Sequence, residues 1–210
     1  MVNTKQILAI VAAIARRMEA EKDFLTQLDN EIGDGDHGIN LARGFRSVQE
    51  KLSTWTDKDI GAIFKGVGME LVSTVGGASG PLYGTAFMKA GNVCKGKTEL
   101  TDADIVAAFN AAVGGVQMRG KAVEGEKTML DALCPALKIF KADIDDGKTL
   151  IESLMAAVEA AANGVEFTKT IIATKGRAAY LGERSLGHQD PGATSSLFML
   201  QTALDVLKRA

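Results

Sequence analysis

The chain has 210 residues, of which 46% are hydrophobic and 24% charged, and its formal net charge at pH 7 is -2. These values are typical of an ordinary soluble protein, and we expect residues 1–210 to form a single domain. The scattered lysines exclude a nucleic-acid surface, and the apolar run at 7–14 is too short for a membrane span and lacks a signal-peptide cleavage site. We therefore expect a cytoplasmic protein that binds neither nucleic acid nor membrane.

Apolar residues recur at helical spacing along the whole chain, and no run of alternating β-branched and polar residues marks a strand. The sequence therefore predicts an all-α fold of about eight helices. The breaks between them are rich in Gly, Ser, Asp or Arg. In chain order, we expect helices over about 3–28, 39–52, 57–75, 81–93, 101–113, 130–140, 149–173 and 190–207.

Some of these helices contain residues that disfavour a regular helix. Gly114 and Gly115 should weaken the fifth helix, and Pro135 should bend the sixth. Asn163-Gly164 is a candidate interruption of the long alanine-rich helix. The last helix has clear start signals, because an aspartate at the cap position precedes a proline at the first helical position.

The stretch at 28–40, LDNEIGDGDHGIN, is too polar and too rich in glycine for an amphipathic element. It carries Asp29, Glu31, Asp34 and Asp36, and two carboxylates that converge at ~4 Å repel each other by about 4 kcal/mol at an effective dielectric near 20. A cation removes this repulsion, and hard oxygen ligands favour Mg²⁺ or Ca²⁺. Because Mg²⁺ commonly lies between carboxylates and nucleotide phosphates, we predict a magnesium–phosphate site here.

Three familiar motifs match this sequence only by chance. The glycines of the acidic stretch satisfy G-x-G-x-x-G, but no strand precedes them. Residues 115–121 fit the start of a P-loop, yet Ala122 stands where the magnesium-binding Ser or Thr must be. An EF-hand fails because Phe45 falls where the bidentate Glu is needed. The two cysteines have no zinc-site spacing, so we expect neither a zinc site nor a disulfide.

Other glycine-rich loops lead into helix N-termini, where free N–H groups and the helix dipole favour anions. The loop at 76–81 is one of them, although a tight turn between helices explains it equally well. Arg177 is a candidate phosphate clamp, and Met129 is a candidate to line an adenine ring. His37 could bond a phosphate or orient a carboxylate, whereas a capping or packing role is the simpler reading for His188.

The chain contains, in this order, EIGDGDHGIN at 31–40, VGGASGPL at 75–82, RGKA at 119–122, and GRAAYLGERS and GHQDPGATS at 176–185 and 187–195. Together these segments resemble the nucleotide-binding L subunits of bacterial dihydroxyacetone kinases, over essentially the whole chain. The resemblance implies an eight-helix antiparallel α-barrel that binds ADP or ATP and two Mg²⁺ ions in the interhelix loops at one end.

The resemblance also implies the residues of the site. The metal ligands would be Asp29, Asp34 and Asp36. The nucleotide would lie against His37, Gly38, Ile39, Asn40, Ala78, Ser79, Gly120, Met129, Arg177, Asp190, Pro191 and Gly192. No catalytic side chain is implied, because phosphoryl transfer needs chiefly positioning and charge neutralisation.

The family's partners follow from the same resemblance. Dihydroxyacetone is held by a separate K subunit, so we expect a phosphotransferase subunit of glycerol metabolism that is inactive alone. One branch of the family uses free ATP, and in the other a carrier M subunit of the phosphoenolpyruvate phosphotransferase system rephosphorylates ADP that stays bound. We favour the second branch, because the sequence has only the L-like region. An ATP-exchanging kinase subunit for another small polyol or ketose, a nucleotide-dependent regulator of a partner protein, and a homodimer stay open.

Overall fold

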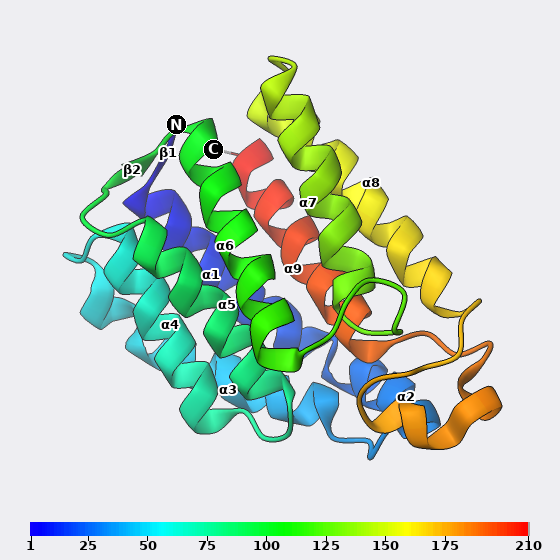
Figure 1. Cartoon of the computed structure of the whole chain (residues 1–210). Helices are drawn as coiled ribbons and strands as arrows, with labels where there is room; N and C mark the ends of the chain where they lie inside the picture. Colours follow the sequence, from blue (N-terminus) through cyan, green and yellow to red (C-terminus); the bar gives the residue numbers. More distant parts are fainter. Residues whose placement is uncertain (210) are drawn as a thin grey trace.

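The computed structural model describes residues 1–209, and helices dominate it (Figure 1). The α-helices are α1 Thr4–Ala20, α2 Lys22–Ile32, α3 His37–Lys51, α4 Ile60–Thr74, α5 Ser79–Val93, α6 Asp102–Gly120, α7 Leu130–Asp145, α8 Leu150–Thr168 and α9 Pro191–Lys208. Two 3₁₀ helices, η1 Leu52–Trp55 and η2 Arg177–Ser185, and the short antiparallel strands β1 Val2–Asn3 and β2 Glu99–Leu100 complete the described elements.

Eight of the helices follow one another around a closed circuit. From α3 to α9 each helix packs against the next, and α1 packs against both α3 and α9 (Figure 1). Helix α2 stands apart from this circuit and packs against α3, α9 and η2 at one end. The turn before α3, the α4–α5 and α6–α7 loops and the segment between α8 and α9 reach the same end (Figure 1).

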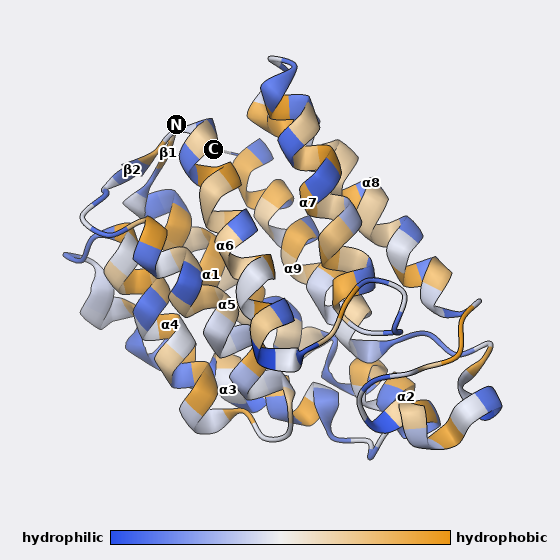
Figure 2. Cartoon of the chain, in the orientation of Figure 1, coloured by the Kyte–Doolittle hydropathy of each residue, from blue (hydrophilic) through white to orange (hydrophobic). Residues whose placement is uncertain are grey.

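The interior is apolar because most helices carry hydrophobic and hydrophilic residues on different sides, as α1, α2 and α3 do (Figure 2). Met18, Leu25, Phe45 and Leu71 belong to one cluster and are fully buried. A second cluster joins α7, α8 and α9 around Phe140 and several fully buried alanines. Burying a large apolar side chain stabilises the fold by roughly 1.5–3 kcal/mol, so these clusters fix the circuit.

The structure confirms a predominantly helical fold and corrects several boundaries. The first predicted helix is two helices, α1 and α2, which meet at Glu21. The break left no signal in the apolar spacing, because Glu21 N–H still donates to the Arg17 carbonyl and Leu25 N–H to that of Glu21. Residues 1–209 therefore contain nine α-helices rather than about eight, and the two-residue strands were too short to predict.

Glycines do not interrupt the helices where the sequence suggested. Helix α6 continues past Gly114 and Gly115 to Gly120, and α8 continues through Gly164 to Thr168. Gly115 and Gly164 lie at interfaces between helices, where the lack of a side chain allows the helices to pack closely. A side chain at Gly115 would approach Lys89 of α5 to 2.9 Å, and one at Gly164 would clash with the Asp131 carbonyl of α7. Helix α7 likewise runs through Pro135.

Among residues 1–209, no helix combines the length and the apolar character needed to cross a bilayer.

Candidate functional site

Three aspartates converge where α2 passes into α3. Asp29 lies in the last turn of α2, and Asp34 and Asp36 follow in the turn before α3. One carboxylate oxygen of each lies within 4.8 Å of the others. Asp29 Oδ2 also accepts hydrogen bonds from the N–H groups of Asp36, at 2.9 Å, and His37, at 3.1 Å. The cluster is therefore built by a few consecutive residues that bond to one another.

Two glycines make this tight turn possible. Gly35 has a φ of +71°, a conformation that L side chains rarely adopt, and a side chain there would clash with Asn30. A side chain at Gly33 would clash with the Asp29 carboxylate itself. The glycines of the acidic stretch therefore serve the turn, and not a dinucleotide.

The donor set suits a hard divalent cation. Three carboxylates meet, and within residues 1–209 the ion pair that involves them joins Arg177 Nη2 to Asp34 Oδ2 at 2.9 Å. Among the described residues, Asp29 and Asp36 form no ion pair with a cationic side chain. All-oxygen ligands with surplus negative charge are the chemistry that Mg²⁺ prefers, so these residues fit the predicted metal.

His37 begins α3 and links the acidic turn to two other helices. Its Nδ1 lies 2.9 Å from Ser79 Oγ at the start of α5, and its Nε2 lies 2.9 Å from Ser195 Oγ of α9. Ser195 Oγ in turn bonds the Tyr83 hydroxyl at 2.7 Å. Burial lowers the pKa of His37 to about 4 against the opposing pull of Asp29 and Asp36, so the ring is neutral at neutral pH. Its role in this structure is to orient two serine hydroxyls.

The aspartates line a cavity that brings together most of the predicted residues. Its lining includes Asp29, Asp34, Asp36, His37, Ala78, Ser79, Met129, Arg177, Asp190, Pro191 and Gly192. A second cavity shares Ala78, Leu82 and Met129 with the first and adds Val116 and Gly120. The two cavities form a continuous site with a carboxylate-lined end and a more apolar end.

Three predicted residues do not line either cavity. Gly38 packs so closely on α2 that a side chain would clash with the Lys22 carbonyl, and Ile39 is 48% exposed. Asn40 is buried, and its Oδ1 accepts a hydrogen bond from Arg43 at 2.6 Å. All three belong to the first turn of α3. Asn40 N–H donates to the Asp36 carbonyl at 2.8 Å, whereas the N–H groups of Gly38 and Ile39 come before the first helical acceptor, so a role through the backbone stays a prediction for those two.

Asp190 confirms the predicted start of the last helix. Its Oδ2 accepts from Ala193 N–H at 2.7 Å as the N-cap of α9, with Pro191 in first position. Burial is the main cause that raises the pKa of Asp190 to about 7, and the nearby ammonium of Lys127 opposes this rise.

Sequence reasoning missed several residues of the site. Lys127, Thr128 and Lys175 line the first cavity, and Lys127 is only 1% exposed. No motif indicated these residues. Lys127 and Thr128 belong to the polar loop before α7, and such a loop is ordinarily expected to be exposed to solvent. The sequence places neither Glu31 nor His188 in the predicted site. In the structure the two form a pair, with His188 Nδ1 3.0 Å from Glu31 Oε2.

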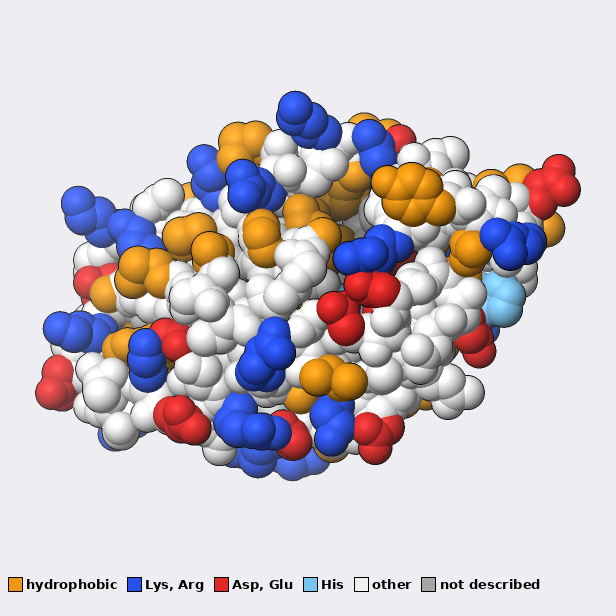
Figure 3. All heavy atoms as spheres, turned by 90° about the horizontal axis from the view of Figure 1, so that it is seen from below, with side chains coloured by type: hydrophobic (Ala, Val, Ile, Leu, Met, Phe, Trp, Pro, Cys, Tyr) orange, Lys and Arg blue, Asp and Glu red, His pale blue; other side chains and the backbone are white. Residues whose placement is uncertain are grey.

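The loop end of the molecule is shown from below in Figure 3. Acidic and basic side chains lie side by side on this face, with hydrophobic side chains near them. A surface of this mixed kind agrees with an anionic ligand held through both metal-binding carboxylates and cationic groups.

Comparisons with known proteins agree with this geometry. Residues 31–205 match the family model described as the DAK2 domain. The chain is 48% identical over 181 residues to the ADP-binding subunit DhaL of the PEP-dependent dihydroxyacetone kinase of Escherichia coli K12, covering 86% of each chain. It is 41% identical to the ADP-binding subunit DhaL of the PTS-dependent dihydroxyacetone kinase of Lactococcus lactis, covering 91% of each.

Longer proteins contain a similar region. The human triokinase/FMN cyclase is 32% identical over 98% of this chain, which spans 36% of that protein. The dihydroxyacetone kinase of C. freundii has been solved in a native form and in complex with AMP-PNP and Mg²⁺. These structures superpose with TM-scores of 0.74 and 0.73 at 27% identity, over 95% of this chain and about a third of theirs. The match of the family model over most of the chain places this protein in the DAK2 domain family.

Proposed function

We propose that this chain is the ADP-binding subunit of a PEP-dependent dihydroxyacetone kinase. It would pass a phosphoryl group from a magnesium-bound nucleotide to dihydroxyacetone held by a separate K subunit. The observation that carries the proposal is the convergence of Asp29, Asp34 and Asp36 at one end of a cavity whose other end is apolar. The names of the E. coli and L. lactis relatives support it, as does the AMP-PNP and Mg²⁺ complex of the C. freundii kinase.

The site divides into a phosphate half and a nucleoside half under this proposal. Asp29, Asp34 and Asp36 would hold two magnesium ions, which supply neutralisation of the phosphate charge when bound. Ser79, oriented by His37, and the first turns of α3 and α5 would donate to phosphate oxygens. The nucleoside would lie against Gly120, Met129, Arg177 and the start of α9, at Asp190, Pro191 and Gly192.

Arg177 would need to change partner when the site is loaded. Its guanidinium now bonds the Asp34 carboxylate, and 64% of its side chain is exposed. An exposed ion pair of this kind contributes only about 0–1 kcal/mol, so it can exchange readily. Arg177 is therefore free to turn from Asp34 to the nucleoside part of the ligand once a metal holds the carboxylate.

The partners follow from the same proposal. The K subunit would bring dihydroxyacetone, and an M subunit would rephosphorylate the bound ADP from the phosphotransferase system. A second candidate, a kinase that exchanges free ATP, is favoured by the similarity to human triokinase/FMN cyclase over 98% of this chain. A regulatory role and a homodimer remain untested expectations.

The fold also has a finer description under this proposal. The closed circuit of α1 and α3 to α9 would be an eight-helix antiparallel α-barrel, with α2 as an addition at its loop end. The nucleotide site would then occupy the interhelix loops at that end of the barrel.

Retention of nucleotide by the purified protein tests the proposal. We expect ADP to survive dialysis in the presence of Mg²⁺, and EDTA to release it. The isolated chain should not phosphorylate dihydroxyacetone with ATP, whereas addition of K subunit, M subunit and a phosphoenolpyruvate-driven carrier system should give activity. Rapid exchange of bound ADP for ATP would favour the second candidate, and turnover by the chain alone would contradict both.

A further inference from the structure

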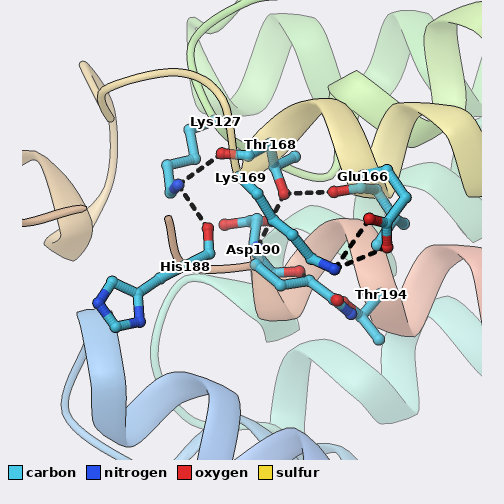
Figure 4. Close-up of polar contacts among 9 residues, drawn as sticks. Lys127, Glu166, Thr168, Lys169, His188, Asp190 and Thr194 are labelled. Carbon is cyan, nitrogen blue, oxygen red and sulfur yellow. Dashed lines mark hydrogen bonds and ion pairs between the residues drawn. The ribbon is translucent and has the colours of Figure 1, made fainter. Parts of the chain in front are cut away.

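Lys127 is a lysine buried in a loop, between α6 and α7, where lysines are ordinarily solvated. Its side chain belongs to a group of polar contacts between this loop, the end of α8 and the segment before α9 (Figure 4). Nζ donates to the carbonyl oxygens of Thr168 at 2.5 Å, His188 at 2.6 Å and Ile171 at 3.3 Å. An ammonium has three protons to donate, so these carbonyls satisfy it completely.

The loop that carries Lys127 is shaped to point it inward. The Asp131 carboxylate, in the first turn of α7, accepts from Gly125 N–H at 2.5 Å and from Thr128 N–H at 2.7 Å. Between them, Lys127 takes a φ of +61°, a left-handed conformation that is uncommon outside glycine. A strained backbone and a buried charge coincide at one residue, which indicates that the inward position of the amine is required.

The three carbonyls belong to segments that continue into the cavity. Thr168 ends α8, and its hydroxyl accepts from Asp190 N–H at 3.0 Å. Ile171 begins the irregular segment that leads to residues 175–178. His188 lies two residues before Asp190, the N-cap of α9. One amine therefore joins three cavity-lining segments, 127–129, 175–178 and 190–192, which we call the loop wall.

Few other contacts join the segments of the loop wall, among them the hydrogen bonds from Thr174 N–H to the Glu126 carbonyl at 3.3 Å and from Asp190 N–H to the Thr168 hydroxyl at 3.0 Å. The hydrophobic cluster in this region consists of Ile32, Ala173 and Ala178 with Leu181 against them, which is small beside the clusters of the helical circuit. Burial lowers the pKa of Lys127, and the carboxylates of Asp190 and Asp131 oppose that change by favouring the charged form. Loss of the ammonium would leave buried carbonyls without donors, so the segments would have to separate to reach water.

We propose that Lys127 is a positioning residue for the nucleoside half of the site: its ammonium holds the loop wall in register and thereby sets the affinity for the nucleoside part of the ligand. This inference rests on the proposed nucleotide-binding function. The carboxylate end, residues 29–37, is fixed by its own amides and receives no hydrogen bond from Lys127 among the described residues. Lys127 should therefore affect the two halves unequally.

The experiment compares two ligands in the full-length chain by isothermal calorimetry. Mg·ADP engages both halves of the site, whereas Mg·pyrophosphate engages the phosphate half alone. Lys127→Met should weaken Mg·ADP binding about 10- to 100-fold, the range expected when charged hydrogen bonds are lost, and leave Mg·pyrophosphate within about twofold.

Lys169→Met is the matched control. Lys169 lies one residue beyond α8, beside the same cluster, but its amine turns away to the exposed Glu166 carboxylate (Figure 4). The control also removes one lysine charge but leaves the contacts of the loop wall intact. The affinities for Mg·ADP and for Mg·pyrophosphate should therefore both stay unchanged.

Each outcome decides the inference. Equal weakening of both ligands, or undiminished Mg·ADP binding by Lys127→Met, would overturn it while leaving the proposed function intact. Failure of the unaltered protein to bind Mg·ADP would overturn the proposed function and this inference with it.

A second variant covers the case in which methionine at position 127 prevents folding. Lys127→Gly relieves the left-handed backbone and leaves a space for a small amine. Added butylammonium should then restore Mg·ADP affinity at least in part, with no effect on Mg·pyrophosphate. Absence of any selective restoration would overturn the proposal.

Discussion

The carboxylate end and the loop wall line the same cavity but are assembled in different ways. At the carboxylate end, Asp29 bonds the amides of residues seven and eight positions later. In the loop wall, Lys127 bonds carbonyls 41 to 61 positions away. The first is a local structure that a short peptide motif encodes, whereas the second exists only after α7, α8 and α9 have packed.

The difference indicates how the site could tolerate change. A local turn keeps its geometry if distant helices shift, so the proposed metal ligands are protected from changes elsewhere in the chain. The loop wall depends on the packing of three helices, which makes the nucleoside half the adjustable part of the site. The four predictions below test this contrast, from the largest expected effect to the smallest.

Removal of one carboxylate should abolish the metal function of the carboxylate end. Asp36→Asn keeps the shape of the side chain but removes a charge, and an interaction worth about 4 kcal/mol at an effective dielectric of 20 corresponds to roughly 1,000-fold. We expect a loss of this order in Mg²⁺-dependent ADP binding, measured by calorimetry. Unfolding by urea should be little changed, and a variant that still bound Mg·ADP normally would refute the metal assignment.

His37 should make the metal-free protein sensitive to acid. Its folded pKa of about 4 lies below the usual 6.5, so the unfolded chain binds a proton first as the pH falls. This contribution of His37 to stability is complete above about pH 6.5 and is lost between there and pH 4, by at most ~3 kcal/mol. The raised pKa of Asp190, about 7, acts in the opposite direction over the same range, so the effect of His37 is read from the difference between two proteins. In urea unfolding with EDTA, the stability of the unaltered protein relative to His37→Gln should fall by this amount from pH 6.5 to pH 4.

His188→Gln is the control for this pH effect. His188 lies in the loop wall region and pairs with Glu31 at the surface, where 39% of each side chain is exposed. The free energy of unfolding of His188→Gln should then differ little from that of the unaltered protein between pH 4 and pH 6.5. If His188→Gln removed the acid sensitivity instead, the effect would belong to the surface pair.

Asp131 should matter to the loop wall and not to the carboxylate end. Asp131→Asn turns one of two charged acceptors into an amide that faces Gly125 N–H or Thr128 N–H, at a cost of about 2 kcal/mol. Urea unfolding should show this loss, and Mg·pyrophosphate binding should not change. Asp145→Asn, in an exposed pair with Lys141, should cost only a few tenths of a kcal/mol.

Gly164 tests the contact of α8 with α7, outside both ends of the cavity. Gly164→Ala places a methyl group in a clash with the Asp131 carbonyl oxygen, and because this neighbour is backbone we expect the upper end of the overpacking range, about 3 kcal/mol. The better helix propensity of alanine offsets up to ~1 kcal/mol, so we expect a net loss of about 2 kcal/mol. Gly114→Ala has open space around it and should be neutral or slightly stabilising in the same thermal unfolding measurement.

The sequence was informative where the structure is local. The Asp190 cap, the Pro191 start and the aspartate cluster could all be predicted, because each involves residues that are close in sequence. Resemblance then added Ala78 and Gly120, which the structure brings to the same pair of cavities.

The remainder required tertiary structure. Lys127 and Thr128 read as loop residues because nothing near them shows that Asp131 folds the loop inward. Gly115 and Gly164 read as helix breakers because their partners, Lys89 and Asp131, lie on other helices. Where propensity and packing disagreed, packing decided the outcome.

Pro135 and Gly164 have a joint consequence for how this chain can vary. Proline lacks an N–H, so the Asp131 carbonyl four residues earlier has no helical donor, and Gly164 is the residue whose backbone approaches that carbonyl. The two residues, each unfavourable in an isolated helix, therefore complement each other across α7 and α8. Variation at one position should be constrained by the residue at the other, so their substitutions should be non-additive and best made together.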